Sequence, residues 1–466
     1  MPPLYGPPPS PLQIAVPAGL GDQPEAWALS LAVGALLVGL GFWQHRRAWG
    51  YPVGLAGLVA LLTAPALGMV ERAVWGAWPT VDKAGAYLFY LRGVGWRPFA
   101  PGALHDPALK LIGIQVAHLW PTAALDLLLS PHGAFNAQAL LHLWLAWLCA
   151  WLLCREAGAR PWPALLAAAP FALGLHVFRD VNYYTIEKSG VFGIPLFLWA
   201  LARARRQGGR WLVLPPLLLG GLAFYNEYLA LLGATMAGLW LLGSWRGRAF
   251  AVVGACALAL VPVATLQTLL FRGAGALADP DRFLWERAAL DTLSLWPPRW
   301  YHLELWRVLN LPLVLYGAVG LWRERARPEA RWAAAVVLLT GILALGPRLA
   351  GDQAVGVPNP VFMACWRLVP GFWRIARPEF LFEGAYLALL VSSGVALSAV
   401  LTRTRWLALL SAALLAGWLW GARGHPVYPS FSAPVEVSLP EGWEKGVFGA
   451  EPGGRVDLLR AKNLGG

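Results

Sequence analysis

The residues best suited to chemistry at a membrane surface are three arginines, Arg367, Arg374 and Arg377, in and just before LVPGFWRIARPEFLF (368–382). A guanidinium keeps its charge and can bind phosphate oxygens through two parallel hydrogen bonds. Arg374 and Arg377 are three residues apart, so on one helical turn they share a face. Trp373 lies beside them, and a long apolar run follows. This pattern suits a phosphate carried on a lipid; the alternative is ordinary contact between arginines and lipid head groups.

A single acid stands out in PTVDKAGAYLFYLRGVGWRPF, where Asp82 precedes a run of aromatic residues. A carboxylate in this position can act as a general base or bind a divalent metal ion. Asp82 can equally be the N-cap of a short helix that begins at TVD. Further along, His105 and Asp106 are adjacent, so their side chains point in different directions. They are candidates for substrate binding, or part of a turn before Pro107.

Two more polar stretches interrupt the apolar sequence. RDVNYYTIEKSG (179–190) contains Tyr184 and Glu187. A tyrosine ring can stack on a sugar face, and Glu187 can contact a substrate or form a solvated pair with Lys188. Glu227, in FYNEYLA, lies between two apolar runs. A carboxylate at membrane depth costs free energy unless it faces water or a partner, so we expect Glu227 at a hairpin tip on the outer side.

The elements that position these residues are predicted to be membrane helices. The chain has 466 residues, of which 58% are hydrophobic and only 13% charged, whereas a soluble domain has about a quarter charged residues. The mean hydropathy is +0.53, and apolar runs long enough to cross a bilayer recur. The 27 tryptophans suit the aromatic belts at membrane interfaces. We therefore expect an all-α, polytopic transmembrane protein, without the alternating pattern of a membrane β-barrel.

The four cysteines lack the spacing of a metal site, so we interpret them as structural thiols. Twelve spans are predicted from the apolar runs. The predicted spans are 26–43, 52–70, 135–154, 162–178, 189–203, 211–224, 227–245, 250–271, 307–322, 332–347, 381–401 and 406–421.

Clustered arginines set the predicted orientation, because loops rich in arginine stay on the cytoplasmic side. This topological role also explains the net charge of +12 without nucleic-acid binding. All these loops share one side only if the apolar stretch 108–129 does not cross, so we interpret it as a helix pair at the outer interface. The arginine-rich loops are 45–47, 155–160, 203–210, 246–248, 323–331 and 403–405. The segments 71–134, 179–188, 272–306 and 348–380 and both termini then lie on the non-cytoplasmic side.

The predicted organisation has three parts. A proline-rich segment (1–25) precedes the transmembrane domain (26–421), whose first outer loop is 71–134. The tail 422–466 is too short for a core of its own, although its PVEVSL stretch could form one docking strand. The sequence contains no GxxxxGK[ST], no HExxH and no GxSxG between a strand and a helix, so an ATP-driven role is not predicted.

The order of these motifs along the chain resembles the order found in a known superfamily. An outer loop with Asp82 is followed by APGALHDP, by FNAQALLHLWLAWLCAWLLCREAG, by FRDVNYYTIEKSGVFGIPLFLWALARARRQ and GGLAFYNEYLALLGA, and finally by PGFWRIARPEF. Over most of residues 52–400 this resembles bacterial polytopic membrane proteins of the C-type (GT-C) glycosyltransferase superfamily, whose members use polyprenyl-phosphate-linked sugars on the outer side of the membrane.

The resemblance implies a site and an activity. Asp82 would be the catalytic base or a metal-associated group, so a divalent metal is possible although no cofactor is certain. Arg374 and Arg377, with Arg367, would bind the donor phosphate, and Glu187 would occupy the polar second-loop position. We expect a glycosyltransferase, multi-pass in the inner (plasma) membrane, whose active face is non-cytoplasmic. Its partners would be membrane lipid, a polyprenyl-phosphate-linked sugar and an unidentified acceptor.

Two other functions stay open. A non-catalytic GT-C-like partner in envelope assembly would keep the fold without the chemistry. A lipid or solute transporter would need polar residues along a path through the bilayer. The sequence offers few such residues, because its charges gather at one face.

Overall fold

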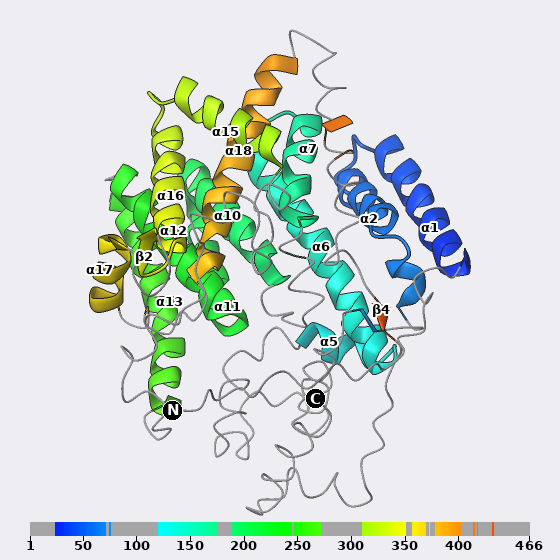
Figure 1. The fold of residues 1–466 in the computed structure, drawn as a ribbon, viewed down its shortest axis with the longest axis horizontal. Helices are drawn as coiled ribbons and strands as arrows, with labels where there is room; N and C mark the ends of the chain where they lie inside the picture. Colours follow the sequence, from blue (N-terminus) through cyan, green and yellow to red (C-terminus); the bar gives the residue numbers. More distant parts are fainter. Residues whose placement is uncertain are drawn as a thin grey trace, which may run out of the picture.

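The computed structural model describes residues 24–70, 74–75, 120–174, 177, 189–244, 247–271, 310–350, 357–369, 372, 378–401, 413–414, 417 and 431–432. This part of the chain is mostly helical, as the sequence predicts, and its helices pack into a bundle (Figure 1).

A helix lies at each predicted span from the first to the one at 381–401. The last predicted span, 406–421, falls almost wholly outside the described residues. The long helices are α1 (Pro24–Trp43), α2 (Gly50–Leu62), α6 (Pro131–Glu156), α7 (Pro161–Ala172), α10 (Gly193–Gln207), α11 (Leu214–Tyr225), α12 (Glu227–Ser244), α13 (Gly247–Phe271), α15 (Leu311–Arg323), α16 (Pro328–Ala344) and α18 (Phe382–Leu401).

Three of these helices are long and apolar enough to cross a membrane: Pro24–Trp43, Gly133–Glu156 and Phe382–Val400. Shorter apolar helices lie at Gly50–Leu62, Gly209–Tyr225, Tyr228–Trp240 and Ala249–Thr265. The helices are thus consistent with a membrane protein, while the count of twelve spans stays a prediction.

Helices α1 and α2 lie side by side at one edge of the molecule (Figure 1) and approach closely through glycines. A Cβ atom added to Gly41 would lie 2.2 Å from the backbone nitrogen of Gly54, and one added to Gly57 would lie 2.6 Å from that of Val38. Only a residue without a side chain fits at such contacts. Small residues at helix contacts are typical of helices that pack within a bilayer.

Helix α6 is the centre of the bundle and contacts α2, α7, α10 and α18. Its first turn is capped by Ser130, whose Oγ accepts a hydrogen bond from the Gly133 amide (3.1 Å). Its last turn ends at Gly158, whose φ of 104° lies in the left-handed region. There the amides of Gly158 and Ala159 donate to the carbonyls of Arg155 and Cys154, the pattern of a Schellman motif.

Three tryptophans on α6 tie it to its neighbours. The indole N–H of Trp144 donates to the carbonyl of Pro52 on α2 (2.9 Å). Those of Trp147 and Trp151 donate to the carbonyls of Leu165 (3.0 Å) and Pro161 (3.1 Å) on α7. Each bond satisfies a polar group that would otherwise be costly inside an apolar bundle.

Two short strand pairs lie outside the helices. β1 (Val74–Trp75) pairs antiparallel with β4 (Phe431–Ser432), so the start of the first long loop contacts the C-terminal tail. β2 (Arg348–Ala350) pairs antiparallel with β3 (Val357–Pro358). The tail thus contributes a strand, but this strand precedes the predicted PVEVSL, which lies outside the described residues.

The ambiguous stretch 108–129 is described only from residue 120 onward. Its short helix α5 (Trp120–Leu125) packs beside the first half of α6, where the Thr122 hydroxyl donates to the side-chain oxygen of Gln138. Whether the whole stretch lies at the interface stays a prediction.

Candidate functional site

Most of the site predicted from sequence falls outside the described residues. This holds for Asp82, His105, Asp106, Tyr184, Glu187, Arg374 and Arg377. Two predicted residues, Arg367 and Glu227, are placed by the structure.

Arg367 lies in the last turn of α17 (Pro360–Leu368), and its side chain is exposed. Phe362 and Trp366 face the interior of the protein and are stacked, with centroids 6.1 Å apart. The neighbouring Leu368 is 79% exposed. An exposed arginine next to an exposed leucine on an otherwise anchored helix suits a position at a lipid interface.

Asn359 fixes α17 to the end of α16. Its side-chain oxygen accepts from the Phe362 amide (3.2 Å), which caps the helix. Its side-chain nitrogen donates to the carbonyls of Ile342 and Gly346, at 2.8 Å each. Since Asn359 is fully buried, these bonds give α17 a defined place on the bundle. On this helix, burial raises the pKa of the Cys365 thiol, which disfavours a reactive thiolate.

Glu227 is the first residue of α12 and is separated from the end of α11 by one residue, at the predicted hairpin tip. The preceding Asn226 is buried, and its side-chain oxygen accepts from the amides of Tyr228 (2.8 Å) and Leu229 (3.3 Å). Asn226 therefore caps α12. The function of the Glu227 carboxylate stays a prediction.

The structure also contains a polar network that our sequence reasoning missed. His142, in the first half of α6, is only 1% exposed. Its Nδ1 lies 2.8 Å from the Ser189 hydroxyl, and its Nε2 lies 2.7 Å from the hydroxyl of Tyr225 on α11. We call His142, Ser189, Tyr225, Gln138 and Thr122 the histidine network.

Hydrogen bonds extend the histidine network along α6 to α5. The Gln138 Nε2 lies 3.3 Å from His142 Nε2, and Thr122 donates to the other end of the same amide. Ser189 directly precedes η5 (Gly190–Phe192), and the ring of Phe192 lies 5.4 Å from that of His142. One imidazole thus connects α5, α6, α11 and the start of the α10 segment.

The signal for this network was present in the sequence. FNAQALLHLW places Asn136, Gln138 and His142 within a predicted span, where each polar group needs a partner. The spacing on one helix could not reveal Ser189 and Tyr225, because those partners come from distant segments.

A second set of buried polar residues lies at the start of α18. Glu383 and Tyr386 are 7% and 2% exposed, and the Tyr386 hydroxyl accepts from the Asn310 amide (3.4 Å). Asn310 caps α15 through the Leu313 amide (3.2 Å). The group therefore joins the first turns of two helices.

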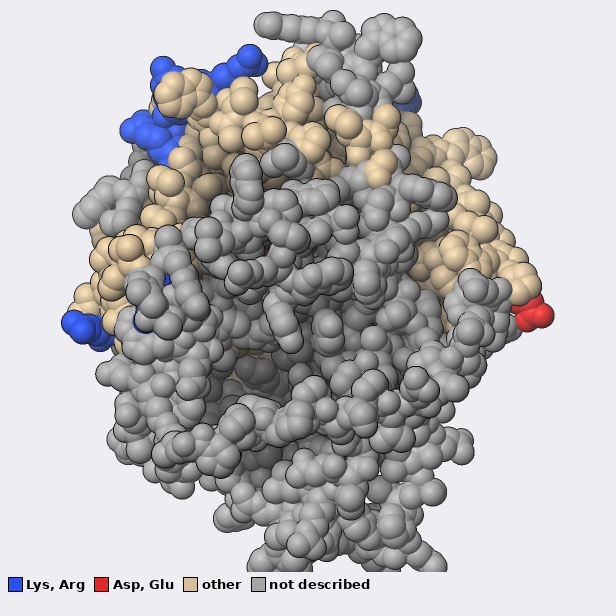
Figure 2. Space-filling view, viewed as in Figure 1, with Lys and Arg blue, Asp and Glu red and all other residues tan. Residues whose placement is uncertain are grey.

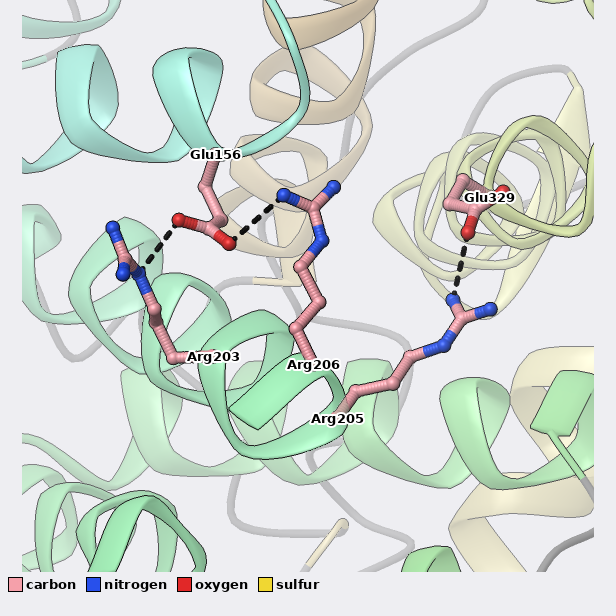
Figure 3. A network of polar contacts seen from close by, with 5 residues as sticks. All are labelled: Glu156, Arg203, Arg205, Arg206 and Glu329. Atoms are coloured by element: carbon pink, nitrogen blue, oxygen red, sulfur yellow. Dashed lines mark hydrogen bonds and ion pairs between the residues drawn. The ribbon is translucent and has the colours of Figure 1, made fainter. Parts of the chain in front are cut away.

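Charged residues gather at the other end of α6. Glu156 is 7% exposed, and its two oxygens pair with Arg203 Nε (2.7 Å) and Arg206 Nη1 (3.0 Å) on α10. Figure 3 shows this fork and a second pair, between Arg205 and Glu329 of α16 (3.0 Å). We call these five residues the arginine cluster.

The arginine cluster links three of the predicted cytoplasmic loops, 155–160, 203–210 and 323–331. A fourth contact joins the first of them to α18, because the Arg160 amide donates to the Ser398 hydroxyl (2.8 Å). Figure 2 shows Lys and Arg atoms at its upper left, over the region where α15 and α16 meet in Figure 1. These loops lie at the same end of the bundle, as the sequence predicts.

In the part of the chain that the structure describes, no group of three or more His, Cys, Asp or Glu side chains is placed to hold a metal ion. Asp82 lies outside that part, so its possible metal-binding role stays a prediction.

Comparison with known protein families finds none whose model matches this chain, and comparison with curated proteins finds no match.

Proposed function

We propose that this chain is a membrane glycosyltransferase that moves a sugar from a polyprenyl-phosphate-linked donor to an acceptor on the non-cytoplasmic side. The proposal rests on the motifs that resemble the C-type superfamily, with Asp82 in the first long loop and Arg374 and Arg377 before α18. The fold supports it by providing an apolar helical bundle suited to a lipid-linked donor.

The observation that carries the proposal is the separation of polar groups between the two ends of α6. The arginine cluster lies at its C-terminal end, whereas the first long loop starts near its N-terminal end, where Asn136 donates to the carbonyl of Val70 (3.0 Å). β1 and β4 add the tail to that loop. A lipid-linked donor needs such an arrangement, because its phosphate stays at one membrane surface while its chain lies in the bilayer.

In the proposed reaction, Asp82 accepts a proton from the acceptor hydroxyl as its oxygen attacks the anomeric carbon of the sugar. The bond from that carbon to the donor phosphate oxygen breaks, with inversion of configuration. Arg374 and Arg377 stabilise the negative charge on the departing phosphate. Arg367, exposed on α17, is available to the same lipid phosphate.

Proteoliposomes with a radiolabelled polyprenyl-phosphate sugar test these roles. We expect Asp82→Asn to lower the transfer rate by about 10²–10⁴-fold, because general-base catalysis contributes a factor of that size. Glu329→Gln is the matched control: it also removes one carboxylate, but at the arginine cluster, and should keep the wild-type rate. Wild-type transfer by Asp82→Asn would contradict the proposal.

The same assay separates the proposed enzyme from a non-catalytic partner, and the sequence of α6 bears on the transporter. A non-catalytic partner would transfer no sugar and would not respond to Asp82→Asn. A transporter is less favoured because α6 carries only apolar residues, LWLAWLCAWLLC, between His142 and Arg155. The polar groups of this central helix therefore do not form a continuous path along it, because this apolar stretch separates the histidine network from the arginine cluster.

A further inference from the structure

Four more arginines lie in or beside the turns of two helical hairpins that contact each other through aromatic rings. Arg46 and Arg47 lie in the turn between α1 and α2, and Arg155 and Arg160 flank the turn between α6 and α7. We call these four residues the basic junction. None of them takes part in the proposed sugar transfer.

Aromatic rings join the two turns of the basic junction. The centroids of Phe42 and Trp162 are 5.1 Å apart, and those of the stacked Tyr51 and Trp151 are 4.8 Å apart. Trp151 and Arg155 are four residues apart on α6 and therefore share a face. The ring contacts place both turns at the same end of the bundle.

Glu156 is the carboxylate nearest in sequence to Arg155 and Arg160, but it does not neutralise the charge of the basic junction. Both oxygens of Glu156 pair with the arginines of α10. Arg155 is held by the carbonyl of Ala159, within its own turn. Over the residues that the structure describes, Arg46, Arg47 and Arg160 are exposed and have no carboxylate partner.

Three exposed tryptophans lie within three residues of these arginines in the sequence. Trp43 is 78% exposed, Trp49 38% and Trp162 55%. Indole rings favour the level of lipid head groups, where the ring contacts acyl chains and the N–H reaches water. An uncompensated basic group bordered by such rings matches a phospholipid in two respects, its anionic phosphate and its apolar glycerol region.

We propose that the basic junction is a binding site for an anionic phospholipid. Arg46, Arg47 and Arg160 bind the phosphate diester, and Trp49 and Trp162 lie against the glycerol and upper acyl chains. A zwitterionic lipid carries a head-group cation that the arginines repel. The site therefore selects phosphatidylglycerol over phosphatidylcholine.

Native mass spectrometry of the full chain in detergent, titrated with each lipid, tests this site. We expect R46Q/R47Q/R160Q to bind phosphatidylglycerol roughly 100-fold more weakly than wild type, because each arginine near a lipid surface contributes roughly fivefold. Wild-type binding should weaken with added salt, and inorganic phosphate should not displace the lipid.

The matched control removes three arginines from another turn at the same end. In R323Q/R325Q/R331Q the lost side chains include Arg325, which lies over the Trp322 ring (4.6 Å), and Arg331, which donates to the Ala326 carbonyl (3.0 Å). This variant should bind phosphatidylglycerol like wild type. R46K/R47K/R160K, which keeps the charge, should retain most of the affinity.

Three results would overturn the proposal: equal wild-type affinity for both lipids, undiminished binding by R46Q/R47Q/R160Q, or an equal loss in both glutamine variants. The last would mean that total charge, and not this junction, attracts the lipid. If R46Q/R47Q/R160Q does not fold, the proposal is tested by the lipid preference and the salt dependence of the wild-type protein.

Discussion

Helix α6 contributes to two polar regions that differ in charge and in exposure, the histidine network and the arginine cluster. The histidine network in its first half consists of uncharged hydrogen-bonding side chains and an imidazole; four of these five residues are buried and Tyr225 is half-buried. The arginine cluster at its end is ionic, and Arg203 and Arg206 are 33% and 57% exposed. His142 and Glu156 are fourteen residues apart, about 21 Å along a helix that rises 1.5 Å per residue.

The difference follows from the cost of burying charge. Neutral groups can stay inside an apolar bundle if each finds a hydrogen-bond partner, and such contacts then fix the helices that supply them. Ionic groups need water or the lipid head groups nearby. The arginine cluster therefore indicates one edge of the apolar layer, and the histidine network lies within it.

The largest effect should come from His142→Leu. This change leaves the Ser189 and Tyr225 hydroxyls without their buried imidazole partner, so we expect a loss of about 3 kcal/mol in unfolding free energy. Thermal unfolding in detergent, followed by intrinsic fluorescence, measures it. His45→Leu is the matched control, because His45 is exposed and bonds only to the Phe42 carbonyl in its own turn. Equal stability of the two variants would show that the histidine network does not hold the helices together.

Glu156→Gln should have a smaller effect. It removes the charge that pairs with two arginines, which we expect to cost about 1–2 kcal/mol, between the values for exposed and buried pairs. Glu329→Gln removes one pair whose partners are 40% and 60% exposed, so its cost should be below about 1 kcal/mol. The same unfolding measurement, repeated at high salt, should shrink both effects. If Glu329→Gln costs more than Glu156→Gln, burial does not set the strength of these pairs.

The positions of the helices along the chain were largely predictable from sequence. Apolar runs gave a helix at each described span, and the rule for arginine loops placed 155–160, 203–210 and 323–331 together, as their ion pairs confirm. Both signals are local, because each depends on residues close together in the chain.

The histidine network could not be predicted in the same way. Its members come from segments that are distant in sequence, and only the packing of α6 against α11 and the start of the α10 segment brings His142, Ser189 and Tyr225 together. The role of Glu156 was also missed, since the sequence shows an acid among arginines but not which of them it pairs with. The catalytic roles of Asp82, Arg374 and Arg377 stay predictions.

The central claim is that the arginine cluster and the proposed catalytic residues lie on opposite sides of the membrane. Single cysteines at positions 82, 374 and 206, in a chain whose four native cysteines are replaced by serine, test it with a membrane-impermeant maleimide. Positions 82 and 374 should react in intact cells, and position 206 only after the membrane is permeabilised. Reaction of all three from the same side would contradict the account.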